Sequence, residues 1–122
     1  MPDVRAGPSA RTGYVVVLLR GELDITNSAS TARILQAAVA PQLRIIADLA
    51  EVTFMDCRSV RELMSVRARA QQADGALLLA GLQPAVRRLL CHLDLIGLLP
   101  VFASADEAAN GRQEPRGALA AR

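Results

Sequence analysis

The sequence is poor in aromatic residues, lacks tryptophan, and contains no lysine, so that all 14 basic residues are arginine. Two phenylalanines and one tyrosine cannot build an aromatic core, so we expect a core of leucine, valine, isoleucine and alanine. The net charge of +2 is small, and the arginines are scattered rather than arranged in a basic stripe with aromatics between them. This pattern argues against a nucleic-acid-binding protein.

Export signals and membrane-spanning runs are also missing from the sequence. The opening residues, MPDVRAGPSAR, contain no apolar stretch like that of a signal peptide, and no apolar run approaches the length of a membrane span. Only two cysteines are present, which fits a reducing compartment without structural disulfides. We therefore predict a cytoplasmic protein with no membrane insertion.

Motifs for catalysis, metal binding and phosphate binding are absent too. The only histidine is His92, and neither a CxxC nor an HxxxH pattern occurs, so no metal site is predicted. The glycine-rich loops that hold nucleotide phosphates do not occur either. The composition therefore predicts a binding protein that is not an enzyme and needs no cofactor.

Apolar segments of two kinds alternate along the chain. Short continuous apolar runs predict strands buried on both faces, at residues 14–20, 43–49 and 76–80. Apolar residues at helical spacing predict helices, at residues 27–40, 56–73 and 84–93, with a short strand near 100–103 and a helix over 105–109. Alternating strands and helices require crossover connections. We expect an α/β sandwich with a mixed, largely parallel sheet of four to five strands and about four helices.

The length of 122 residues is enough for one domain. We expect the domain over residues 12–109. The segments at residues 1–11 and 110–122 are rich in polar and small residues, and we expect a flexible N-terminal segment and a disordered C-terminal tail.

Two polar segments follow the first two predicted strands, GELDITN at residues 21–27 and AEVTFMDCR at residues 50–58. Loops at the carboxyl ends of neighbouring parallel strands meet at one edge of the sheet. Asp24 and Asp56 could then form an acid/base pair, although a turn and a helix cap explain both carboxylates more simply.

The two thiols leave a redox role open. Cys57 stands at a predicted helix start beside Arg58, and both the helix dipole and the guanidinium favour a thiolate. Oxidation of Cys57 would then change a binding surface directly. A redox pair with Cys91 is one alternative, and two ordinary thiols are the simpler one.

Three blocks of the sequence, at residues 15–35, 43–64 and 76–102, resemble the STAS domain family of bacterial anti-sigma factor antagonists. The first contains the GELD turn, the second the strand and switch helix around FMDCRS, and the third a strand followed by a helix that begins with proline. The resemblance implies a partner-switching regulator. Such a protein binds an anti-sigma factor with a GHKL-type, ATP-binding kinase fold and so releases a sigma factor for transcription.

The phosphorylation motif of that family is altered in this chain. In the family motif, D-S-S-G or D-S-T-G, the kinase phosphorylates the residue two positions after the aspartate. Asp56 matches the aspartate, but Arg58 occupies the acceptor position and Ser59 replaces the glycine. We therefore expect an antagonist without the usual switch. Phosphorylation of Ser59 instead is the rival hypothesis, and it is disfavoured because one residue turns the side chain about 100° around a helix.

The resemblance predicts one partner-binding surface, with Ile25 and Met55 as apolar anchors if they are exposed. The alternative is that both side chains pack under their loops, and for Met55 we favour this alternative. The residues of the surface are Asp24, Ile25, Thr26, Asn27, Asp56, Cys57, Arg58, Ser59, Arg61 and Glu62. Other functions stay open: an adaptor subunit of a lipid- or anion-transport complex, or a small nucleotide-binding or redox-responsive module. A weak homodimer is a further alternative.

Overall fold

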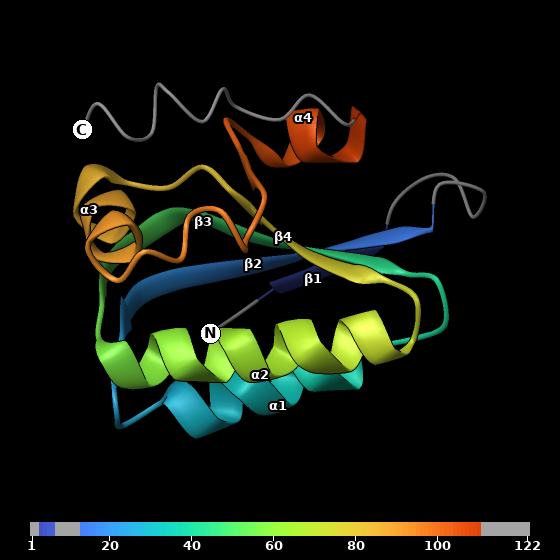
Figure 1. The fold of residues 1–122 in the computed structure, drawn as a ribbon, viewed down its shortest axis with the longest axis horizontal. Coiled ribbons are helices and arrows are strands. Elements are labelled where there is room, and N and C mark those ends of the chain that lie inside the picture. The colour runs from blue at the N-terminus through green and yellow to red at the C-terminus, as the bar shows by residue number, and fades with distance from the viewer. Residues whose placement is uncertain (1–2, 7–12, 111–122) are drawn as a thin grey trace.

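The computed structural model describes residues 3–6 and 13–110, which form one five-stranded sheet with helices on both sides (Figure 1). The strands are β1 (Asp3–Ala6), β2 (Tyr14–Leu23), β3 (Arg44–Met55), β4 (Ala76–Ala80) and β5 (Val101–Phe102). The helices are α1 (Ser28–Ala37), α2 (Cys57–Gln72), α3 (Pro84–His92) and α4 (Ala105–Asn110). The strand order is β1-β2-β3-β4-β5, and only β1 runs antiparallel to its neighbour. The predicted α/β class and mixed, largely parallel sheet are confirmed.

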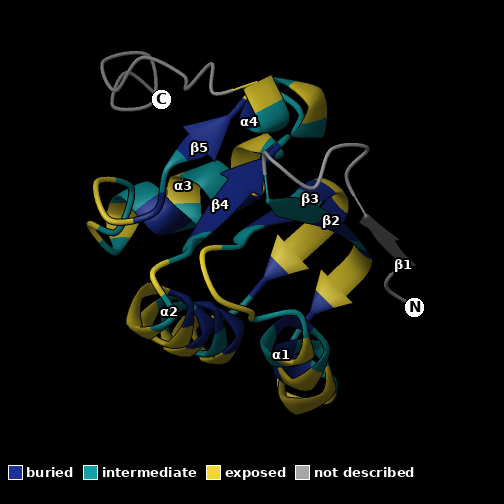
Figure 2. Ribbon diagram, turned by 90° about the vertical axis from the view of Figure 1, so that its right-hand side faces the viewer, coloured by how far each residue is buried: buried dark blue, intermediate teal, exposed yellow. Residues whose placement is uncertain are grey.

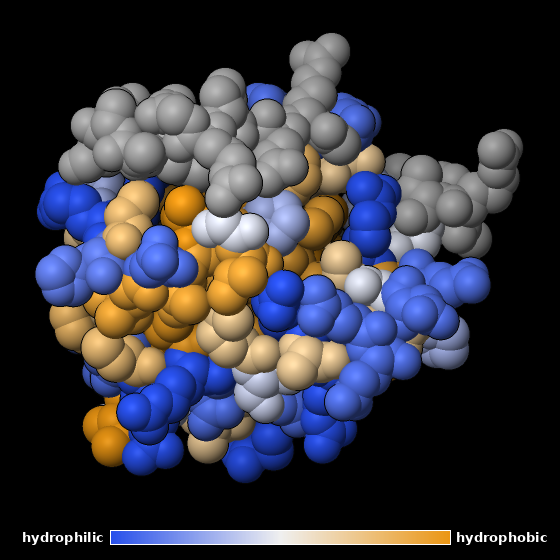
Figure 3. Space-filling view, in the orientation of Figure 1, coloured by the Kyte–Doolittle hydropathy of each residue, from blue (hydrophilic) through white to orange (hydrophobic). Residues whose placement is uncertain are grey.

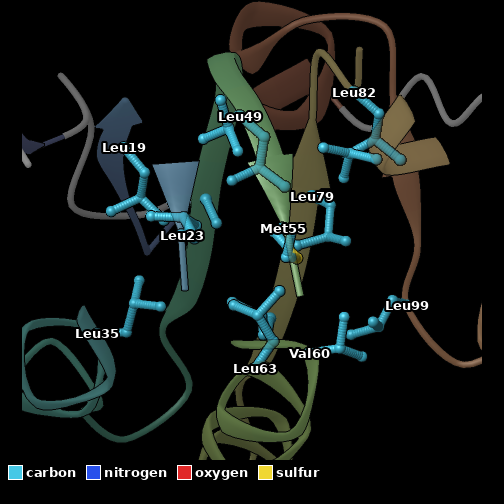
Figure 4. Close-up of a cluster of buried hydrophobic side chains, with 14 of the residues drawn as sticks. Leu19, Leu23, Leu35, Leu49, Met55, Val60, Leu63, Leu79, Leu82 and Leu99 are labelled. Carbon is cyan, nitrogen blue, oxygen red and sulfur yellow. The ribbon is translucent and has the colours of Figure 1, made fainter. Parts of the chain in front are cut away.

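The core has two parts because the central strands bury both faces. Helices α1 and α2 lie side by side against one face of the sheet, and α4 lies against the other (Figures 1 and 2). The larger cluster, shown in Figure 4, includes Leu35 of α1 and Leu63 of α2. The smaller one joins Ile46 and Leu78 of the sheet to Ala108 of α4. Adjacent strand residues point to opposite faces, which explains why these strands read as continuous apolar runs.

Strands β2 and β3 continue beyond the apolar runs that predicted them. We expected loops at residues 21–27 and 50–58, but the two strands stay paired as far as Leu23 and Met55. β4 ends opposite Asp48, so the last part of β3 pairs with β2 alone. Two register shifts interrupt this pairing, and at each of them β3 has one residue more than β2. Two exposed residues separate the buried Leu49 from Val52, and two more separate Val52 from Met55, so no continuous buried run marks the strand.

The N-terminal segment contains a strand that the sequence did not predict. Asp3–Ala6 form β1, which pairs with residues 15–18 of β2, so this part of the segment expected to be flexible belongs to the sheet. An edge strand is held by backbone hydrogen bonds to one neighbour and needs no apolar run of its own. Asn110, which we assigned to the tail, closes α4. The rest of the two terminal segments, residues 1–2, 7–11 and 111–122, lies outside the described residues.

Side-chain oxygens cap two of the helices, and the cap role considered for Asp56 is confirmed. The carboxylate of Asp56 accepts a hydrogen bond from the backbone N–H of Ser59 at 2.9 Å, which caps α2. The hydroxyl of Ser104 accepts one from the N–H of Glu107 at 3.1 Å. Among the described helices, none combines the length and hydrophobicity that crossing a membrane requires.

Candidate functional site

The two segments predicted to form the site adjoin where β2 and β3 end. Leu23 and Met55 are register partners, and the N–H of Asp56 donates a hydrogen bond to the carbonyl of Leu23 at 3.1 Å. This bond places the turn at residues 24–27 beside the start of α2 at residues 56–62. We call these two segments together the rim.

The turn at residues 24–27 is fixed by its own side chains. The carboxylate of Asp24 accepts hydrogen bonds from the N–H of Thr26 at 2.9 Å and from the Thr26 hydroxyl. The Asn27 amide oxygen accepts one from the N–H of Asp24, and its nitrogen donates to the carbonyl of Glu22 at 2.8 Å. Asn27 immediately precedes α1, but its side chain makes no capping bond and binds the preceding turn instead. The turn is thus held in one shape without help from a partner.

The hydrogen bonds of this turn also control its charge. The hydroxyl of Thr26, followed by its backbone N–H, lowers the pKa of Asp24 below the usual value of 3.8. Hydrogen bonds to the carboxylate favour the ionised form. Asp24 therefore presents a negative charge at neutral pH.

The two candidate apolar anchors differ in exposure. Ile25 is 67% exposed at the tip of the turn, whereas Met55 is only 5% exposed and packs in the core. Phe54, which was not among the predicted site residues, is 48% exposed. A strand period of two does not reveal it, because counting from the buried Val52 would place Phe54 inside, and only the register shift next to Phe54 turns it outward. We had placed both residues in a loop, where this rule does not apply.

At the start of α2, the predicted residues divide into exposed and buried ones. Cys57, Arg58 and Arg61 are exposed, and Glu62 is half-buried. Ser59 is only 4% exposed, so its prediction as a surface residue was wrong. The N–H of Ser59 donates the capping hydrogen bond to Asp56, so Ser59 lies in the first turn of α2. The buried Leu63 follows four residues later, and residues at this spacing lie on the same helix face.

The hydroxyl of Ser59 lies between α1 and α2. It borders a small hollow together with Ser28 and Thr31 of α1. Within the part of the chain that the structure describes, the hydroxyl has no hydrogen-bond partner. An enzyme could reach this oxygen only if the first turn of α2 moved away from α1.

The carboxylates of Asp24 and Asp56 stabilise the local backbone of the rim. Asp24 accepts hydrogen bonds from Thr26, and Asp56 caps α2, which are the turn and cap roles that we weighed against an acid/base pair. Over residues 3–6 and 13–110, no group of three histidine, cysteine or acidic side chains is arranged to hold a metal ion. The rim is therefore best described as a surface of fixed shape, in which the two aspartates hold the backbone.

Neither Cys57 nor Cys91 forms a disulfide bond. Cys57 is exposed at the first residue of α2, and Cys91 is partly buried in α3. The redox role of either thiol remains a prediction.

Comparison with known proteins identifies the family. The model of the STAS domain matches residues 6–108. The chain is similar to the structure of Bacillus SpoIIAA, an anti-sigma factor antagonist, in its unphosphorylated form, with 21% identity, coverage of 91% of this chain and 95% of that one, and a TM-score of 0.75. An anti-sigma factor antagonist from Mycobacterium paratuberculosis is similar at 20% identity, with 91% and 93% coverage and a TM-score of 0.75.

A transport protein shares the same fold. The chain is similar to a sulfate transporter family protein from Wolinella succinogenes at 18% identity, with 90% and 89% coverage and a TM-score of 0.68. The search of curated proteins returned no match. Because the family model spans most of the sequence and the fold recurs in these structures, the chain belongs to the STAS domain family.

Proposed function

We propose that this chain is a cytoplasmic anti-sigma factor antagonist. It binds an anti-sigma factor with a GHKL-type kinase fold through the rim, and so frees a sigma factor for transcription. The observation that carries this proposal is the hydrogen bond from Asp56 to Leu23, which joins a rigid, exposed turn to an exposed helix start. The fold shared with two anti-sigma factor antagonists supports it.

The rim has the composition of a protein-binding surface. Ile25 projects an apolar side chain that is 67% exposed, with the charge of Asp24 beside it and Arg58 and Arg61 on the adjoining helix. An apolar anchor within a polar border is the common pattern of binding hot spots. Negative charge on the turn and positive charge on the helix would fix the orientation of a complementary partner.

The usual phosphorylation switch does not operate in this protein. The acceptor position holds Arg58, whose guanidinium cannot accept a phosphoryl group as a serine does. The adjacent hydroxyl, on Ser59, is buried against α1. Binding is therefore constitutive or regulated in another way.

Arg58 is placed where a cation is unfavourable for the helix itself. A positive charge at a helix N-terminus costs about 0.3 to 1 kcal/mol. Arg58 is exposed, and within residues 3–6 and 13–110 no ion pair compensates it. A carboxylate of the partner would supply that compensation, so we assign Arg58 to the interface.

Binding to the anti-sigma kinases of the same genome tests the proposal. Calorimetry should show a complex with one of them, and the complex should release its sigma factor. Asp24→Ala and Arg58→Glu should each weaken the complex, whereas Arg69→Glu, at the other end of α2, should not. A chain that binds none of these kinases, or rim variants that bind like the native protein, would refute the proposal.

Incubation with the cognate kinase and ATP tests the missing switch. Intact-mass measurement should show no added phosphate on the native chain and one on Arg58→Ser, which restores the acceptor. Stoichiometric phosphate on Ser59 of the native chain would show that the switch has moved by one residue.

An adaptor role in a lipid- or anion-transport complex is the second candidate. The similarity to the Wolinella succinogenes sulfate transporter family protein favours it, since the fold also occurs in that setting. Affinity capture from native cells separates the two candidates. Recovery of a transporter subunit in place of an anti-sigma kinase would support the adaptor.

A further inference from the structure

An open groove borders the rim between the end of β3 and α3. It has a volume of about 650 Å³ and is mostly apolar. The residues that line this α3 groove are Phe54, Met55, Ala85, Arg88, Leu89, Cys91 and His92. Figure 3 shows hydrophobic residues gathered over α3 and the segment that follows it. None of the α3 residues belongs to the surface that the sequence predicted.

Phe54 forms one side of the groove and is unusually exposed for its size. It is 48% exposed, whereas the other phenylalanine, Phe102, is 5% exposed in the core. β3 fixes its position, since Phe54 pairs with Glu22 of β2 and the next residue, Met55, is buried. Exposed aromatic side chains on rigid backbone are common at the centres of protein interfaces.

Helix α3 forms the other side with a single helical face. Ala85, Arg88, Leu89 and His92 are spaced at i, i+3, i+4 and i+7, so they lie in one stripe along α3. The alanine leaves room at one end of this stripe, and the leucine supplies an apolar centre. A stripe of this kind, facing an apolar floor, suits the packing of a second helix.

The charge of the groove has one sign. Arg88 is the one formally charged residue among those that line it, no acidic residue lines it, and α3 contains neither aspartate nor glutamate. Arg88 is exposed, and within the described part of the chain no ion pair engages it. Glu22 pairs with Phe54 in the sheet but does not line the groove. Negative charge on a partner, beside its apolar side chains, would therefore complement Arg88.

We propose that the α3 groove receives an amphipathic helix whose apolar stripe is flanked by acidic side chains. The apolar side chains pack between Phe54 and Leu89, and a carboxylate pairs with Arg88. The groove and the rim are continuous, because Met55 lines the groove and Asp56 begins the rim. The identity of the partner, an anti-sigma factor, rests on the proposed function, and the helix is a second contact of the same partner.

Two synthetic peptides test the chemistry without any partner protein. They share one leucine stripe at helical spacing and differ only in their flanking residues, glutamate in one and lysine in the other. Titrated into the full-length ¹⁵N-labelled chain, the acidic peptide should saturate and shift the amide signals of Phe54, Ala85 and Arg88, and the basic peptide should not. Equal binding of both peptides, or shifts confined to other parts of the protein, would overturn the proposal.

Substitutions within the groove test the same contact. Ala85→Glu and Arg88→Glu should each weaken binding of the acidic peptide by about tenfold or more, and Phe54→Ala by a similar factor. Leu98→Ala and Arg69→Glu are matched controls, because both residues are exposed and neither lines the groove. Thermal unfolding checks each variant. Ala85→Glu deletes no buried side chain. It can therefore still test the peptide contact if Phe54→Ala does not fold.

The affinity of the same variants for the anti-sigma factor separates the groove proposal from the proposed function. If the native chain and all groove variants bind it equally, the groove proposal fails and the proposed function stands. If the acidic peptide binds in the groove but no anti-sigma factor binds the chain, the proposed function fails and the groove proposal stands.

Discussion

The two halves of β3 differ in how many neighbouring strands they have. As far as Asp48, β3 lies between β2 and β4, and Ile45, Ile46 and Ala47 are all fully buried. Beyond Asp48 only β2 pairs with it, and Val52 and Met55 are buried while the residues between them are exposed. Figure 2 shows these exposed ends of β2 and β3. Where β4 ends, one edge of β3 has no further partner among the described strands, and most side chains of this segment are open to solvent.

The two halves also differ in regularity. The first half keeps an unbroken register, and the second contains both register shifts. Extra residues of this kind re-aim side chains and are common next to functional sites. The regular half therefore supplies stability, and the irregular half positions Phe54 and the rim.

Substitutions in the same strand should reveal this division, with the largest effect in the regular half. Ile46→Ala should lower the free energy of unfolding by about 2 to 5 kcal/mol, because it leaves a cavity in a fully buried site. Thr53→Ala, at an exposed position of the second half, should cost less than about 1 kcal/mol. Urea unfolding measures both. Similar losses from the two variants would contradict the comparison.

Removal of the cap of α2 should have an intermediate effect, because it touches the junction between the irregular half and the rim. Asp56→Ala loses the hydrogen bond to the N–H of Ser59 and should cost about 0.5 to 2 kcal/mol. Asp56→Asn keeps a capping oxygen and should cost less. If both variants have the same urea midpoint of unfolding as the native chain, the cap contributes nothing to stability.

Arg58→Glu should separate binding from stability. Replacing a cation by a carboxylate in the first turn of α2 should raise the free energy of unfolding by about 0.3 to 1 kcal/mol. The same change should weaken binding of the anti-sigma factor, since it reverses a rim charge. Measurement of both properties on one sample gives the test. A variant that is less stable than the native chain would mean that Arg58 supports the fold.

The smallest expected effect is a change in the pKa of Asp24. It tests whether the hydrogen bonds from Thr26 hold the Asp24 carboxylate in the rim turn. Thr26→Val removes the hydroxyl donor and should raise this pKa toward 3.8, as followed by NMR of the carboxyl carbon. Ser30→Ala is the control, because the Ser30 hydroxyl donates to the Asn27 carbonyl and not to Asp24. An unchanged pKa in Thr26→Val would show that the hydroxyl does not hold the carboxylate.

The sign of the pH dependence follows from the lowered pKa. The ionised Asp24 stabilises the folded turn fully above its unfolded pKa near 3.8, and this contribution is lost as the pH falls through the lower folded value. We expect the native chain to lose stability as the pH falls below about 3.8, and Thr26→Val should lose less over the same range.

Local sequence patterns predicted the regular parts of the fold. The run ALLLA gave the bounds of β4, residues 76–80, and Asp56 was identified as the cap of α2. Both features depend on residues close in the sequence. The strand depends on the burial of a short apolar run, and the cap depends on the Asp56 side chain and the N–H of the residue three positions later. The extension of β3 to Met55 depends on pairing with β2, and no local pattern revealed it.

The sequence by itself determined the alternation of strands and helices and the leucine- and valine-rich core. Only the tertiary structure decided which side chains reach the surface: Ser59 packs against α1, Met55 joins the core, and Phe54 faces the α3 groove. The physical reason is that burial depends on which elements pack over a residue. Periodicity along the chain sets the direction of a side chain within its own element, but not what lies opposite.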